Sequence, residues 1–120
     1  MSAESELIAL LTSASELADI NANKVFLNAA DERTAVPYVV VSSARDNDKT
    51  LEGSTDTVHY TYTIACWGRS ATEAEAVADA VEDVIDDANN GVEVLTRTGG
   101  FDQDTSMDVS VLLADEWRQA

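Results

Sequence analysis

The sequence TVHYTYTIACWGRSATEAEAVADAVEDVIDDANNG, residues 57–91, changes its hydrophobic period partway along. Apolar and polar residues alternate over 57–67, which places one set of side chains on each face of a strand. From residue 70 onward the apolar residues recur every three or four positions, as on one side of an amphipathic helix. The stretch therefore predicts a strand over 57–67 that leads directly into a helix. The strand face expected to meet the core carries Val58, Tyr60, Tyr62, Ile64 and Cys66.

The predicted helix has recognisable start and stop signals. Ser70 followed by Glu73 forms a capping-box pattern at its beginning, and Asn90-Gly91 is a typical C-terminal stop. Its acidic residues lie opposite an apolar stripe, which we expect to pack against a sheet. The stripe consists of Ala74, Val77, Ala78, Val81, Val84, Ile85 and Ala88.

The residues before this strand predict one more helix and two more strands. Leucines and alanines spaced by three and four predict a helix over 4–18. A short strand is expected over 24–28 and a longer one over 37–45. The only proline, Pro37, stands at the start of the longer strand, since it has no backbone N–H to donate. Residues 46–56 are rich in Asp, Asn, Gly and Ser, which predicts a long loop.

The residues after the helix predict two further strands, over 92–104 and 107–117. Alternation in the second strand assigns Met107, Val109, Val111 and Leu113 to its core face, and the glycines of RTGG (97–100) predict a strand bend or hairpin tip. The element order is then α-β-β-β-α-β-β. It predicts one α+β domain over residues 1–120, with two helices packed on one face of a mostly antiparallel sheet.

The strong negative charge limits the possible functions. The chain has 23 acidic and 7 basic residues, for a formal net charge of -16. Nucleic acid is bound mainly through Lys and Arg, so this composition argues against direct DNA binding. The acids are spread along the chain, which suits a folded surface in concentrated salt. A halophilic source is one explanation and an ordinary acidic protein is the other. The chain shows no signal peptide or membrane span, and we expect an intracellular protein.

No catalytic, cofactor or metal site is predicted. His59 and Cys66 are seven residues apart on one strand, so they lie on opposite faces and cannot act as a pair. Residues 46–53 resemble the opening of a calcium loop but lack its third oxygen ligand and closing glutamate. A weak cation contact there, and a small enzyme that uses scattered carboxylates, are the remaining chemical alternatives. We expect a protein that is not an enzyme.

The order of elements and a few marker residues resemble the tail terminator (tail completion) proteins of long-tailed viruses. The markers are Val25-Phe26, Pro37-Tyr38-Val39-Val40, Cys66-Trp67 and the helix start from Ser70 to Glu75. The resemblance implies a subunit of a ring, of about six copies, that caps the tail tube, stops its growth and joins the head connector. The implied partners are the tail tube protein and the head-tail connector protein, with DNA passing through without specific binding. The implied location is the head-proximal end of the virion tail, and the host cytoplasm during assembly.

Such a subunit would bind its neighbours through exposed loops on a rigid sheet. The candidates are the 46–56 loop and the 97–103 turn, and the residues selected from them and their borders are Arg45, Asp46, Lys49, Leu51, Arg97 and Phe101. An alternative function is an acidic intracellular binding protein, such as a nuclease inhibitor, that mimics nucleic-acid charge. A defined ring in high salt favours the first function, and a monomer that pairs one to one with a basic protein favours the second.

Overall fold

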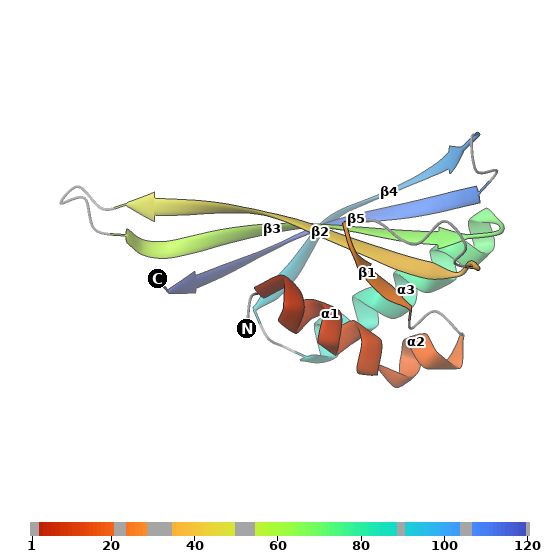
Figure 1. The fold of residues 1–120 in the computed structure, drawn as a ribbon, viewed down its shortest axis with the longest axis horizontal. Coiled ribbons are helices and arrows are strands. Elements are labelled where there is room, and N and C mark those ends of the chain that lie inside the picture. Colours follow the sequence, from red (N-terminus) through yellow and green to blue (C-terminus); the bar gives the residue numbers. More distant parts are fainter. Residues whose placement is uncertain are drawn as a thin grey trace.

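The computed structural model of the protein is an α+β fold with three helices on one face of a five-stranded sheet (Figure 1). It describes residues 3–20, 24–28, 35–49, 55–88, 91–103 and 107–119. The elements are α1 (Ala3–Ser13), α2 (Ser15–Asp19), β1 (Val25–Leu27), β2 (Tyr38–Lys49), β3 (Thr55–Gly68), α3 (Ala71–Ala88), β4 (Val92–Asp102) and β5 (Met107–Gln119). The predicted fold class is confirmed.

The sheet has the strand order β1-β2-β3-β5-β4. Its short strand β1 runs parallel to β2 and pairs with Val39, Val40 and Val41 only. All other neighbouring strands are antiparallel, so the expected mostly antiparallel sheet is confirmed. The strand β2 begins directly after Pro37, as predicted from the missing N–H of that residue.

The core lies between the helices and one face of the sheet. The stripe predicted for α3 is buried except at its last member, Ala88, which is exposed at the end of the helix. The predicted core face of β3 is confirmed at Val58, Tyr62, Ile64 and Cys66, which are all buried. The same core includes Leu7, Leu11, Leu17, Val39, Val41, Leu112 and Ala114.

The predicted core face of β5 is wrong. Leu112 and Ala114 are fully buried, whereas Leu113 is exposed. The register with β3 is the reason, because residues paired across a ladder share one face of the sheet. Leu112 pairs with Ile64 and Ala114 pairs with Tyr62, which turns Leu113 to the face without helices. Alternation alone could not decide, since β5 has apolar residues on both faces.

The helix predicted over 4–18 is divided into α1 and α2. Ala14, between them, has an extended backbone conformation with ψ of 130°. The hydroxyls of Thr12 and Ser13 donate hydrogen bonds to the carbonyls of Ile8 and Ala9, a local interaction that competes with helix continuation. The break still leaves both Leu11 and Leu17 fully buried, so both segments contribute to the core.

The predicted loop over 46–56 is largely strand. The strand β2 continues to Lys49 and β3 begins at Thr55, with Asp46 opposite His59 and Asp48 opposite Thr57. Polar side chains did not end the ladder, because its hydrogen bonds come from the backbone. Residues 50–54 lie outside the described residues.

The predicted turn over 97–103 is also strand for most of its length. Arg97 pairs with Leu112, Gly99 with Ser110 and Phe101 with Asp108, so β4 runs through both glycines of RTGG. Neither Gly99 nor Gly100 has a positive φ, unlike Gly91 at +90° after α3. Of the two predicted alternatives, a strand bend and a hairpin tip, the hairpin tip is wrong, because these two glycines lie within the paired strand.

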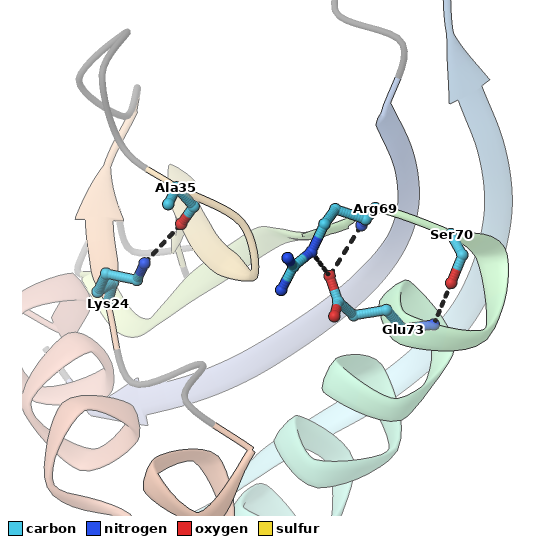
Figure 2. A network of polar contacts seen from close by, with 5 residues as sticks. All are labelled: Lys24, Ala35, Arg69, Ser70 and Glu73. Carbon is cyan, nitrogen blue, oxygen red and sulfur yellow. Dashed lines mark hydrogen bonds and ion pairs between the residues drawn. The ribbon is translucent and has the colours of Figure 1, made fainter.

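The junction from β3 to α3 is capped by side chains (Figure 2). The backbone N–H of Glu73 donates to Oγ of Ser70 at 3.2 Å, which confirms the predicted Ser70 cap. The Glu73 carboxylate accepts from the backbone N–H of Arg69 at 2.8 Å, one residue earlier than a standard capping box would place it. Gly68 precedes this turn, and a Cβ on it would lie 2.6 Å from the backbone nitrogen of Ala74. The turn therefore depends on a glycine.

Candidate assembly surfaces

Among the six predicted interface residues, those that the structure describes fall into two groups on the fold. Arg45 lies on the far half of β2, whereas Arg97 and Phe101 lie on β4. Since β3 and β5 separate β2 from β4, the two groups are at opposite sides of the sheet. The side chains of Asp46 and Lys49, and all of Leu51, lie outside the described part of the chain. The structure thus gives one subunit two separate candidate surfaces.

On the β2 side, Arg45 is exposed beside an aromatic ring. Its guanidinium carbon is 5.9 Å from the ring centroid of Tyr60, and that of Arg118 is 5.8 Å from the same centroid. Arg118 is ion-paired with Glu116, at 3.1 Å from Nε to Oε2, and with Glu6. No ion pair of Arg45 occurs among the described side chains, and a cation on an exposed aromatic face gains only about 0.5–1 kcal/mol. Among the described side chains, Arg45 is thus an exposed cation in contact with the Tyr60 ring.

On the β4 side, Arg97 binds the helix of its own subunit. Its Nη1 lies 2.6 Å from Oδ1 of Asp79 and 3.3 Å from Oε1 of Glu82, and its Nη2 donates to the carbonyl of Glu75 at 3.0 Å. The hydrogen bond with Asp79 is the main reason that the pKa of Arg97 is raised. These contacts fix β4 on α3. They also occupy most of the donors that a neighbouring subunit would use.

Phe101 lies at the rim of a shallow groove between β4, β5 and the start of α3. The side chain is 58% exposed. The groove has a volume of about 350 Å³ and is lined by Ala71, Ala74, Glu75, Gly99, Gly100, Phe101, Asp108, Val109 and Ser110. The absence of side chains on the two glycines leaves this part of β4 open to the approach of another backbone.

A group on the face without helices was missed by sequence reasoning. His59 stacks on Trp117 with ring centroids 4.0 Å apart and an interplanar angle of 6°, and its Nε2 lies 3.0 Å from Oδ2 of Asp115. Trp117 is 53% exposed. The alternation of β5 indicated which residues share a face with Trp117. Only the β3–β5 register reveals the stacking.

No arrangement of the described residues supports metal or thiol chemistry. Among them, no group of three or more His, Cys, Asp or Glu side chains is placed to hold a metal ion. His59 and Cys66 lie on opposite faces of β3, as predicted, and Cys66 is buried. Burial raises the pKa of the Cys66 thiol to about 12. Of the stretch that resembles the opening of a calcium loop, 46–53, residues 46–49 belong to β2 and the remainder lies outside the described residues. Within the described part of the chain no helix has the length and apolar content to cross a membrane.

Comparison with known proteins identifies a family and a solved structure of similar fold. A family model described as "Tail completion protein gp17" matches residues 5–113. A chain in the solved structure "Virion of native gene transfer agent (GTA) particle" is similar to this one with a TM-score of 0.77 and 16% sequence identity, over 95% of this chain and 92% of that chain. At this identity the similarity shows the fold alone. No curated protein matches the chain.

Proposed function

The chain belongs to the tail completion protein gp17 family, and from this premise we propose that it is a structural subunit of a virus-like tail. Copies of it, about six, form a ring that caps the tail tube, stops its growth and provides the joint to the head connector. The family match over residues 5–113 carries this proposal. It also supports a single domain over 1–120.

The fold supports a place in an assembled particle. The similar chain belongs to a structure described as a virion of a gene transfer agent, so an α+β subunit of this shape occurs in such a particle. We place this protein in the virion, at the head-proximal end of the tail, and in the host cytoplasm during assembly. Its partners there are further copies of itself, the tail tube protein and the head-tail connector protein.

The pairing of basic side chains within the subunit supports a passage that DNA crosses without specific binding. Phosphate is held mainly by Lys and Arg. Arg69, Arg97 and Arg118 are each ion-paired with carboxylates of the same subunit, and Nζ of Lys24 donates to the carbonyl of Ala35 (Figure 2). Together with the net charge of -16, this leaves little positive potential for DNA.

The same charge predicts how assembly depends on salt. Subunits of charge -16 repel one another, and the screening length falls from about 30 Å at 0.01 M salt to about 3 Å at 1 M. We expect rings at molar salt and reversible dissociation toward monomers as the salt is lowered. Such behaviour suits a halophilic source.

Sedimentation velocity across a salt series, with circular dichroism in parallel, tests the proposal. A defined ring at high salt, or a ring formed only on the ends of added tail tubes, supports it. A folded monomer at every salt concentration, with and without tubes, contradicts it. If that monomer binds a basic protein one to one, the acidic inhibitor becomes the better function. A ring that persists at low salt would contradict only the role of charge.

A further inference from the structure

Both sides of the sheet have a strand segment whose outer edge is unpaired among the described elements. The strand β4 is last in the sheet and pairs only with β5. On the other side, β1 covers β2 only from Val39 to Val41. The remainder of β2 extends with β3 and β5 beyond the helices (Figure 1). We define residues 96–101 as the β4 edge and residues 44–49 as the β2 edge.

Unpaired strand edges expose backbone donors and acceptors that pair readily with another chain, and proteins usually blunt such edges with charge, proline or very short strands. The β4 edge, TRTGGF, has no proline. Its one charged residue, Arg97, is directed onto α3. The register shift of β4 lies before it, between Val94 and Thr96. This edge is therefore suited to pairing.

Neither edge carries a net negative charge. The β4 edge contains one base and no acid, and the β2 edge, ARDNDK, contains two acids and two bases. In a subunit of net charge -16, these are segments through which two copies approach with little local repulsion. The exposed side chains Leu95 and Phe101 would be covered at the same contact.

We propose that the β4 edge of one copy pairs with the β2 edge of the next, so that the sheet continues from subunit to subunit. The inference rests on the proposed ring and names the contact that builds it. Two different edges meet, which makes the interface heterologous, and a heterologous contact closes into a ring when its rotation allows.

The strand directions fit this pairing. The strands β2, β3, β5 and β4 alternate in direction, so β2 and β4 run opposite ways in one subunit. We place the strands so that each runs partly along the ring axis. Rotation about the axis relates one copy to the next, and it leaves the direction of each strand along the axis unchanged. The β2 of the next copy is then antiparallel to β4. The junction continues the antiparallel pattern of the sheet, with the tilt and stagger that a closed sheet requires.

Hydrogen–deuterium exchange of ring and monomer tests the pairing without altering the chain. We expect peptides that cover 96–101 and 44–49 to exchange at least about tenfold more slowly in the ring. Peptides from the middle of α3 serve as the control and should not change.

Two variants that change the net charge by the same amount test the pairing in a second way. Thr98→Asp on the β4 edge should abolish the ring with an unchanged melt, whereas Thr72→Asp, at the exposed start of α3, should retain it.

Failure of the pairing and failure of the proposed function give different outcomes. A ring in which either edge exchanges as fast as in the monomer overturns the pairing and leaves the ring standing. Protection of 96–101 only after tail tube or connector protein is added assigns that edge to another partner and also overturns it. The absence of a ring under all conditions, tubes included, overturns both proposals.

Discussion

The hydroxyl of Tyr62 donates a 2.8 Å hydrogen bond to Oε1 of Glu116, and both side chains are buried. The other carboxylate oxygen of Glu116 lies 3.1 Å from Nε of Arg118, which is also paired with Glu6 of α1. This network connects β3, β5 and the first helix. Because its inner members are buried, each depends on the others for a hydrogen-bond partner.

Replacement of the central carboxylate should be costly. Glu116→Ala leaves the Tyr62 hydroxyl without its acceptor and takes one carboxylate from Arg118. We expect the free energy of unfolding to fall by about 2–4 kcal/mol. Glu93→Ala, at an exposed position of β4, is the matched control and should change it by less than about 0.5 kcal/mol. Urea denaturation measures both, and equal effects would show that the network does not stabilise the fold.

The buried tyrosine should make stability depend on alkaline pH. Burial, followed by the hydrogen bond to Glu116, raises the pKa of Tyr62. The folded state holds this proton more tightly than the unfolded state, so the contribution is complete below the unfolded pKa of about 10 and is lost as pH rises above it. We expect Tyr62→Phe to lose stability less steeply above that pH, by up to about 1.4 kcal/mol per pH unit. Denaturation curves from pH 8 to 11 on both proteins provide the comparison, and parallel curves would refute it.

The thiol of Cys66 should be inert in the folded protein. The side chain is fully buried, and its burial raises the pKa to about 12, so the reactive thiolate is scarce at neutral pH. We expect a thiol reagent at pH 8 to label native protein at the rate of unfolding and to label denatured protein at once. Cys66→Ala should still assemble. Rapid labelling of the native state would reveal an opening at the sheet–α3 interface that the structure does not contain.

Gly68 should be required for the turn into α3. A Cβ at this position would lie 2.6 Å from the nitrogen of Ala74 and 3.0 Å from the carbonyl carbon of Glu73, which are backbone atoms with little freedom to move. We expect Gly68→Ala to lower the free energy of unfolding by about 1–3 kcal/mol. Gly99→Ala has open space and should leave the monomer melt unchanged. Comparable melts for both variants would mean that the turn adjusts without cost.

The buried side of α3 should not tolerate a charge. Val81 is fully buried in the core, and Val81→Asp places an unpaired carboxylate there, with a cost of several kcal/mol. We expect this variant to be unfolded. Ala76→Asp adds the same charge on the exposed side of the same helix and should fold. Circular dichroism melts distinguish the two, and a cooperative melt of Val81→Asp at the wild-type temperature would show that the stripe is not core.

The sequence alone determined the features that depend on neighbours along the chain. The period of α3 identified its buried stripe up to Ile85, the alternation of β3 identified its core face, and Ser70 marked the start of the helix. Each follows from a local repeat or a local hydrogen bond, so no knowledge of distant residues was needed. The α+β class followed from the order of these elements.

Only the tertiary structure decided which strands are neighbours and in what register. Leu112, rather than Leu113, faces the core because it pairs with Ile64, a residue far away in the sequence. The polar stretch at Asp46 and the glycines at 99 and 100 became strand because partner strands supply backbone hydrogen bonds that no local pattern reveals. For the same reason the candidate residues Arg45, predicted at the border of a loop, and Arg97, predicted within a turn, lie on opposite sides of one sheet. Long-range pairing and not local sequence sets their positions.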